Sequence, residues 1–311
     1  MSSNGRSSSR EAGSARGPLD PRFPLTLSSK HHFVEFERLE SELQKAQDDP
    51  VVKASLKNAF TDPPSSLFQV RGPDYLRAGG GGKNLTHLKV PSKESPYELV
   101  GVNMFRTGRR MKHVAEEIGE IKRFLQSNFA DEPDAVFPQF ILINWLMSPL
   151  FGWGKSHIVQ HVFRLRDNAF TERDDALIAA FKRFRAGSDS ERNHQLKYMF
   201  RIVDAPSTVK NAISYMGGER PVLIGKALTT HYNFGRNYVE INSDVSSSKI
   251  ASAINGTILK NVETLVMDCS WLLEGQKDEE LPERILTKIR WVWNSADDVV
   301  VSLDDDGERD D

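Results

Sequence analysis

The sequence predicts an α+β fold, in which a curved, mainly antiparallel sheet packs against helices and a long apolar helix lies in the C-terminal part of the chain. Three observations lead to this prediction. Several segments alternate apolar and polar residues with the two-residue period of a strand that has one solvent-facing side. Helical patterns separate some of these segments. A serine cluster then opens a nearly continuous apolar run over residues 246–273.

The clearest strand pattern covers residues 194–203, where apolar residues occupy one face and mostly polar residues the other. Residues 137–147 are apolar on both faces, so we expect that strand near the centre of the sheet. The remaining predicted strands are 67–71, 97–105, 157–166 and a hairpin that joins 221–232 to 237–245. Helices are predicted at 113–126, 173–184 and 207–216.

The run 246–273 predicts the long apolar helix. Asp244 and the serines at 246–248 are favourable N-cap residues, and Gly275 can end the helix. Gly256 costs a helix up to about 1 kcal/mol relative to alanine, so we expect it to allow close approach of a facing backbone, at Gly225. A shorter helix is predicted over residues 279–289. The apolar residues at helical spacing are Ile250, Ile254, Ile258, Val262, Val266 and Cys269.

Composition divides the chain into four parts. Residues 1–30 are rich in serine, glycine and arginine, and residues 295–311 are strongly acidic, so both are expected to be disordered tails. Residues 31–65 carry two helical patterns and form a predicted helical N-terminal extension. Continuous strand and helix patterning over residues 66–294 predicts one domain.

Charge and cysteine content narrow the class of protein. A net charge of −2 at pH 7 gives no whole-chain attraction to nucleic acid. The single cysteine, Cys269, rules out an internal disulfide framework and indicates a reducing compartment, so we expect a cytoplasmic protein with a buried thiol. The first 29 residues lack the apolar core of a secretory signal. The sequence contains no run of 18 apolar residues without a charge, so no transmembrane helix is expected.

No motif predicts a catalytic, metal or cofactor site. The glycine run at 78–84 lacks the spacing and the following Ser or Thr of a phosphate-binding loop. His157 and His161 are four residues apart, but they fall in a strand pattern with no third ligand nearby in the sequence. No nucleophile–base arrangement is recognisable, so we expect a non-enzymatic protein that uses no cofactor and no metal.

Lys226 suggests a binding site. Strand alternation places it on the same side as Ile224 and Leu228, toward an apolar interior, where an ammonium group needs an anionic partner. Two partners are open: Glu240 on the adjacent hairpin strand, or the charged head group of a bound amphiphile. In the second case the predicted helix would supply the apolar wall of the site through Ile254, Ile258 and Val262.

Five segments of the chain resemble the C-terminal domain of plant Enhanced Disease Resistance 2 proteins. The resemblance covers residues 66–294 and includes the Arg71-Gly72-x-x-Tyr75 opening, the Leu-Ile-Gly-Lys strand that contains Gly225, the Asp-x-Ser-Ser-Ser cap and a Glu-Glu-Leu-Pro-Glu turn. The segments are 68–76, 97–105, 191–213, 221–251 and 272–286.

The resemblance implies a regulatory setting rather than a reaction. The longer plant proteins place a phosphoinositide-binding pleckstrin-homology domain and a START-type lipid-binding domain before this module, restrain defence-linked cell death and associate with endomembranes. Only about 65 residues precede the module here, so we expect a stand-alone module without either domain, and phosphoinositide targeting does not carry over. No family catalytic residue can be transferred.

Three classes of function are open. The leading one is a lipid or hydrophobic-ligand binding module, peripheral on endomembranes, in which the sheet wraps the long helix in a manner similar to the helix-grip arrangement of START domains. Its expected partner is an anionic lipid or another amphiphile. The alternative is a protein-interaction or regulatory module whose helix is simply core, and the third is an enzyme with an unrecognised site.

Overall fold

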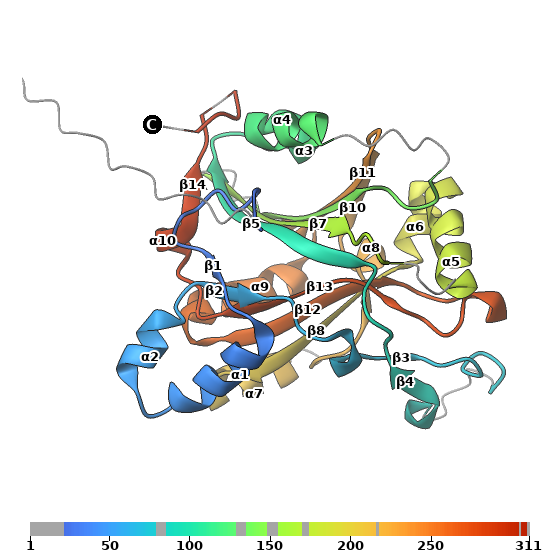
Figure 1. Cartoon of the computed structure of the whole chain (residues 1–311), viewed down its shortest axis with the longest axis horizontal. Coiled ribbons are helices and arrows are strands. Elements are labelled where there is room, and N and C mark those ends of the chain that lie inside the picture. Colours follow the sequence, from blue (N-terminus) through green and yellow to red (C-terminus); the bar gives the residue numbers. More distant parts are fainter. Residues whose placement is uncertain are drawn as a thin grey trace, which may run out of the picture.

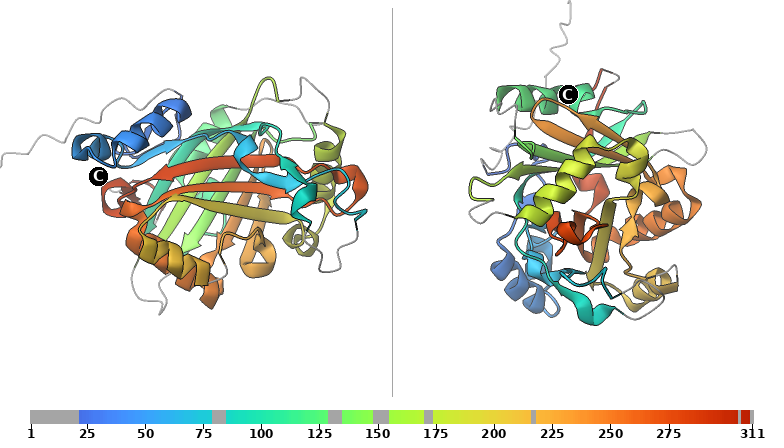
Figure 2. Two further views of the ribbon diagram at one scale, coloured as in Figure 1. Left: turned by 90° about the horizontal axis from the view of Figure 1, so that it is seen from below. Right: turned by 90° about the vertical axis from the view of Figure 1, so that its right-hand side faces the viewer.

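Two six-stranded sheets form the framework of the protein (Figure 1). The structure is a computed structural model that describes residues 22–78, 85–128, 135–147, 155–169, 174–215, 218–304 and 306–309. One sheet, here called the β12 sheet, has the order β1-β2-β13-β12-β8-β9, and the other, the β6 sheet, has the order β10-β11-β6-β7-β5-β14. Viewed from below, the strands of the two sheets cross one another (Figure 2).

The β12 sheet is antiparallel except for its first pair of strands. Its members are β1 (His32–Phe33), β2 (Ala59–Thr61), β13 (Ile285–Val292), β12 (Val266–Leu273), β8 (Leu196–Asp204) and β9 (Val222–Leu223). β12 pairs with β8 on one side and with β13 on the other, and β1 pairs with β2 in parallel. The sheet therefore joins strands from the beginning, middle and end of the chain.

The β6 sheet is mixed. Its members are β10 (Thr229–Phe234), β11 (Tyr238–Asp244), β6 (Phe140–Met147), β7 (Ser156–Leu165), β5 (Tyr97–Thr107) and β14 (Val300–Ser302). β11 pairs with β6 in parallel and β14 with β5 in parallel, whereas the remaining neighbours are antiparallel. A separate ribbon is formed by β3 (Gln69–Arg71) and β4 (Lys89–Pro91).

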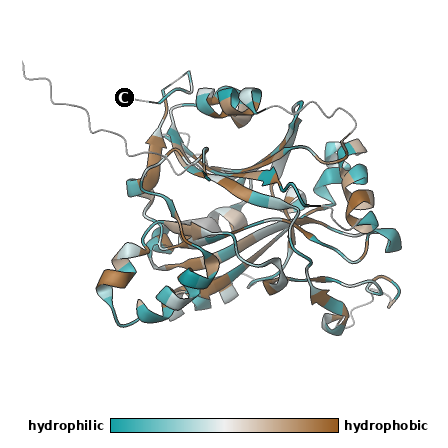
Figure 3. Ribbon diagram, viewed as in Figure 1, coloured by the Kyte–Doolittle hydropathy of each residue, from teal (hydrophilic) through white to brown (hydrophobic). Residues whose placement is uncertain are grey.

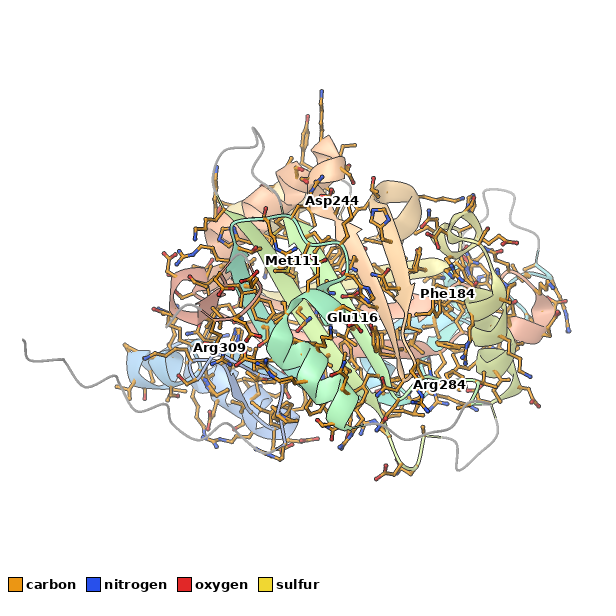
Figure 4. The ribbon with its side chains drawn as sticks, turned by 90° about the horizontal axis from the view of Figure 1, so that it is seen from above. Met111, Glu116, Phe184, Asp244, Arg284 and Arg309 are labelled. Atoms are coloured by element: carbon orange, nitrogen blue, oxygen red, sulfur yellow. The ribbon has the colours of Figure 1, made fainter. Side chains whose placement is uncertain are left out.

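Helices cover the outer faces and the ends of the two sheets. α3 (Val114–Glu117) and α4 (Gly119–Ser127) lie across the β6 sheet, as the labelled Glu116 shows in Figure 4. α1 (Phe36–Lys45) and α2 (Pro50–Ser55) pack beside β2 and β12. α5 (Asp175–Ala186) contributes Leu177, Phe181 and Phe184 to the core between the sheets. The others are α6 (Asp189–Asn193), α7 (Ser207–Tyr215), α8 (Ile224–Ala227), α9 (Lys249–Asn261) and α10 (Ala296–Val299).

The main core lies between the two sheets. Apolar residues run along the strands of both, whereas the helices mix polar and apolar residues (Figure 3). Because side chains alternate along a strand, one face of each strand points to this core. From the β6 sheet it receives Ile141, Ile143 and Phe163, and from the β12 sheet Cys269, Trp271, Ile289 and Trp291.

The structure confirms the α+β class with large sheets packed against helices. The strands predicted at 97–105, 137–147, 157–166 and 194–203 correspond to β5, β6, β7 and β8, and β6 lies in the middle of its sheet as expected. The predicted hairpin exists as β10 and β11, which pair from Thr229 with Asp244 to Phe234 with Val239. Its first segment differs, because residues 224–227 form the helical turn α8.

The prediction of a long helix over residues 246–273 is wrong. Ser248 does cap a helix, accepting from the amide of Ala251 at 3.3 Å, but α9 ends at Asn261 and a 3-10 turn (η4, Val262–Thr264) follows. Residues 266–273 are the strand β12. The prediction of a short helix over residues 279–289 is also wrong, because residues 285–289 belong to β13 and only a 3-10 turn (η5, Asp278–Glu280) precedes them. The helix-grip arrangement that was expected around this long helix is not confirmed.

The regions expected to flank the domain take part in the sheets. Phe23, Leu25 and Leu27 are buried, and β1 and β2 add two strands to the β12 sheet. β14 pairs with β5, so the described residues after 295 do not form the disordered acidic tail that was expected. Residues 1–21 lie outside the described part of the chain. None of the helices in the described ranges is long and apolar enough to cross a membrane.

Candidate functional site

An apolar cavity of about 650 Å³ lies between the two sheets. Its strand-borne walls are the inward residues of both sheets, including Trp145 and Met147 from β6 and Tyr198 and Phe200 from β8. α8 and α9 close the remaining side through residues such as Ile224, Ala251 and Ile258. The rest of the lining includes Met104, Val159, His161, Val222, Ala227, Leu228, Val245, Val262, Leu265, Met267, Cys269, Trp291 and Asn294.

The alternation of the strands makes this lining apolar. In β12, Met267, Cys269 and Trp271 point inward, whereas Asp268 and Ser270 point to the opposite face of the sheet. Aromatic rings pack edge to face beside the cavity: the centroids of Trp145 and Tyr198 are 5.1 Å apart with an interplanar angle of 75°. Such rings form a rigid wall. They bind apolar groups through van der Waals contact and through the partial charges on the edge and face of each ring.

The cavity opens to solvent at the N-terminal end of α9. Ile250 lines it and is nevertheless 69% exposed, which is unusual for a large apolar side chain. Ser248, Gly218 and the exposed Arg220 also line the cavity. We call these four residues the mouth of the cavity, because Ile250 and Arg220 among them are exposed to solvent.

His161 is a buried ionisable residue on the inward face of β7. It is 1% exposed, and its Nδ1 lies 3.2 Å from the carbonyl oxygen of Ile143. A carbonyl oxygen can only accept, so Nδ1 carries the proton and Nε2 presents a lone pair. That Nε2 finds no hydrogen-bond partner in the described structure. Burial lowers the pKa of His161 from 6.5 to about 4, so the ring is neutral near pH 7.

Cys269 and Asn294 are the other polar residues of the inner wall. The Cys269 thiol lies 3.1 Å from the Tyr198 hydroxyl, and burial raises its pKa to about 12. The thiol is therefore protonated at neutral pH, which confirms the buried, unreactive cysteine expected from the sequence. Asn294 Oδ1 lies 3.1 Å from Nε2 of His31, whose pKa is lowered to about 4 by burial.

The expected role of Lys226 is not supported. Its side chain is exposed on α8 and is not part of the cavity lining, because the helical turn breaks the strand alternation that placed it inside. Ile258 and Val262 do line the cavity, while the side chain of Ile254 lies outside the described residues. The predicted anionic-head-group site at Lys226 therefore does not form.

Glu240, the proposed partner of Lys226, belongs to a different cluster on the outer face of the β6 sheet. It is 0% exposed and accepts hydrogen bonds from the amide of Ala115 at 2.8 Å and from the side chains of Asn144 and Asn233, both at 2.9 Å. Burial raises its pKa. These donors satisfy the hydrogen-bonding capacity of the Glu240 carboxyl group. We therefore interpret the cluster as a structural contact that holds α3 on the sheet.

The residues of the predicted structural motif, Arg71, Gly72 and Tyr75, lie at the β3–β4 ribbon and the loop that follows β3. Arg71 donates to the carbonyl of Gly275 at 3.1 Å and pairs with Glu274 at 3.1 Å, and its guanidinium lies 4.9 Å from the ring centroid of Tyr75. A Cβ on Gly72 would lie 2.5 Å from the carbonyl oxygen of Leu88, so a larger residue does not fit. This motif fixes the β3–β4 ribbon to the end of β12 and has no contact with the cavity.

The expected contact between Gly225 and Gly256 is wrong. A Cβ on Gly225 would lie 2.5 Å from Cα of Asn193 on α6, so the close approach exists but involves another helix. A Cβ on Gly256 would meet nothing within 4 Å. Gly256 therefore has no packing function that the structure shows.

Two further cavities have more polar walls. One, of about 570 Å³, is lined by Arg123 and Arg309, which pair with Glu308 and Glu120. The other, of about 660 Å³, contains Arg164, which pairs with Glu98 at 2.5 Å. These three arginines already have carboxylate partners, and Arg185 in the second cavity donates to the carbonyl of Ala135 at 2.6 Å. No group of three metal-ligating side chains occurs in the described ranges.

Comparison with known proteins places the chain in a family. The family described as "Protein ENHANCED DISEASE RESISTANCE 2, C-terminal" matches residues 60–292, from β2 to the end of β13. The chain belongs to this family. The Enhanced Disease Resistance 2 C-terminal domain thus contains every residue that lines the cavity except Asn294.

A curated relative extends this comparison. The Arabidopsis thaliana protein named "Protein ENHANCED DISEASE RESISTANCE 2-like" is 26% identical over 234 residues, which cover 75% of this chain and 28% of the relative. The chain therefore spans less than a third of that relative's length. No solved structure matches the chain.

Proposed function

We propose that this domain is a non-enzymatic module that binds an apolar small molecule in the cavity between its sheets. The observation that carries the proposal is the cavity itself, whose volume of about 650 Å³ and aromatic and aliphatic lining are typical of ligand sites. Protein interiors are otherwise closely packed, and the atoms that line an unfilled space lose contacts. A ligand would restore those contacts.

The expected affinity is measurable. An apolar ligand that hides about 400 Å² of its surface gains roughly 10 kcal/mol, at about 25 cal/mol per Å². Loss of its free motion costs about 4 kcal/mol or more. The difference, about 6 kcal/mol, corresponds to a Kd of tens of micromolar. Titration with a soluble reporter dye covers this range.

A binding role also agrees with the chemistry of the wall. Cys269 is the thiol of the lining, and its raised pKa keeps it protonated. Association with endomembranes, which the family resemblance implies, would bring the mouth close to lipid, and the exposed Ile250 supports such a contact. The alternative, a protein-interaction module without a ligand, requires the cavity to stay empty in the cell.

Two measurements test the proposal. Native mass spectrometry of the full chain, purified gently from a eukaryotic host, should reveal a stoichiometric small apolar molecule. Titration of the delipidated protein with Nile red, an uncharged dye, should then give one saturable site. Quenching of tryptophan fluorescence should accompany binding, because Trp145 and Trp291 line the cavity.

A matched pair of variants on α9 locates the dye. Ala251 lines the cavity, whereas Ala253 is exposed two residues further along the helix. Ala251→Trp should weaken dye binding at least tenfold because the indole occupies the space, while Ala253→Trp should bind like the wild type. Equal affinity in both variants, or a protein that carries no ligand and takes up no dye, would overturn the proposal.

A further inference from the structure

The inner end of the cavity offers a ligand one unpaired acceptor. His161 lines the cavity, and its Nε2 is buried and has no hydrogen-bond partner in the described part of the chain. Its orientation is fixed, because Nδ1 on the other side of the ring donates to the carbonyl of Ile143 at 3.2 Å. The ring is also held by Trp271 and Trp291, whose centroids lie 5.2 Å and 5.4 Å away.

The charge around this acceptor restricts the ligand further. Arg220 is the charged residue of the described lining, and it lies at the exposed mouth. The charged residues of β12 and β13 point to the other face of their sheet, where Asp268 pairs with Arg290 at 2.5 Å. An ion at the inner end would have no opposite charge beside it and would be strongly disfavoured.

Protonation of His161 would not supply the missing charge. Desolvation lowers its pKa to about 4, and the groups that face it are neutral near pH 7: His31, whose pKa is also about 4, and the buried Tyr198 and Cys269, whose pKa values are raised. A neutral acceptor in apolar surroundings favours a neutral donor, and a buried polar group left without a partner is disfavoured.

We propose that the cavity selects an uncharged lipid alcohol, whose hydroxyl donates a hydrogen bond to Nε2 of His161 while its apolar body fills the space toward the mouth. This inference rests on the proposed function. It differs from the sequence-based expectation of an anionic amphiphile, because the cationic residue required for that ligand, Lys226, lies outside the cavity.

A pair of isomers isolates the hydroxyl. Heptadecan-1-ol and hexadecyl methyl ether contain the same atoms, but only the alcohol can donate a hydrogen bond. Each competes with Nile red for the delipidated full chain at pH 7.5, beside hexadecanoate as the charged probe. We expect the alcohol to bind about threefold to tenfold more tightly than the ether, as one uncharged buried hydrogen bond allows. Hexadecanoate should bind more weakly than either.

Two substitutions assign the preference to His161. In His161→Phe the alcohol and the ether should bind equally, because the ring is kept and the acceptor is removed. In His161→Gln the amide oxygen can accept, and part of the preference should return. Thermal melts of both variants establish that they are folded, and the wild-type comparison stands even if one of them is not.

The possible results separate the two proposals. If alcohol and ether bind the wild type equally, a water molecule or no partner satisfies Nε2, and the inference is overturned while apolar binding stands. The same holds if hexadecanoate binds most tightly. If none of the probes displaces Nile red and the dye itself does not bind, the cavity takes no ligand and both proposals are wrong.

Discussion

Opposite effects are expected when two glycines, Gly225 and Gly256, are changed to alanine. The sequence suggested that they pack against each other, but the structure places them in different surroundings. A methyl group on Gly225 would overlap Cα and Cβ of Asn193, at 2.5 Å and 2.7 Å. Asn193 cannot easily move, because its Oδ1 accepts from the Tyr232 hydroxyl at 3.0 Å.

The magnitudes follow from the surroundings of each glycine. Overpacking of a closely packed site costs about 1–3 kcal/mol, so Gly225→Ala should lower the free energy of unfolding by that amount. Gly256 lies within α9 with nothing within 4 Å of the added carbon, so Gly256→Ala should gain up to about 1 kcal/mol from helix propensity alone. For a domain of this size, each kcal/mol shifts the melting temperature by about 2–4 °C.

Urea denaturation and thermal melting of both variants measure these differences. The slope of the unfolding free energy against urea should be unchanged, since neither variant alters the surface exposed on unfolding. A neutral Gly225→Ala would mean that α6 and α8 are not in the close contact that the structure describes. A destabilised Gly256→Ala would mean that something does face this glycine.

Three shorter predictions concern charge and protonation. Lys226→Met should leave the melting temperature within about 1 °C of the wild type, because the side chain is exposed. A large drop in the melting temperature would mean that Lys226 has a buried partner after all. Arg290→Met should cost about 1–3 kcal/mol in urea denaturation, since the fully buried Asp268 loses one of its two arginine partners and keeps Arg201 at 2.6 Å, and an unchanged free energy of unfolding would contradict the burial of this pair. His161 has a pKa of about 4 when folded and 6.5 when unfolded, so the wild type should lose on the order of 3 kcal/mol as pH falls from 6.5 to 4. The variant His161→Phe should lack this part of the loss, and parallel stability profiles for the two proteins would show that His161 is not buried neutral.

Much of the fold can be predicted from local patterns. β5, β6, β7 and β8 show strand alternation or continuous apolar runs, and all four appear at the expected positions. The failure at residues 262–273 has a physical cause. An apolar segment with Val262, Val266 and Cys269 fits a helical period, but the same segment also alternates, with Asp268 and Ser270 on one face. The choice is decided by β8 and β13, which pair with this strand from distant parts of the chain.

Only part of the apolar lining of the cavity could be predicted from the sequence. Ile258 and Val262 were named from sequence and do line the cavity. His161 was considered only as a metal ligand beside His157, because its burial depends on Trp271 and Trp291 in the opposite sheet. The signal that could have identified it was present: it is the polar residue on the inward face of β7, between Val159 and Phe163.

The distribution of charge between the two faces of the β12 sheet explains how an apolar cavity can coexist with a highly charged chain. On the outer face Lys197 pairs with Glu283 at 2.6 Å, and Lys288 pairs with Asp62 at 2.5 Å. These pairs link the sheet to segments far away in sequence, so the cations are engaged and do not compete for the inner face. The inward positions of this sheet can then be mostly apolar without loss of these ion pairs. His161, on the facing sheet, adds a neutral polar group to the interior, and its unpaired nitrogen is why we expect the ligand to be an alcohol rather than a hydrocarbon or an ion.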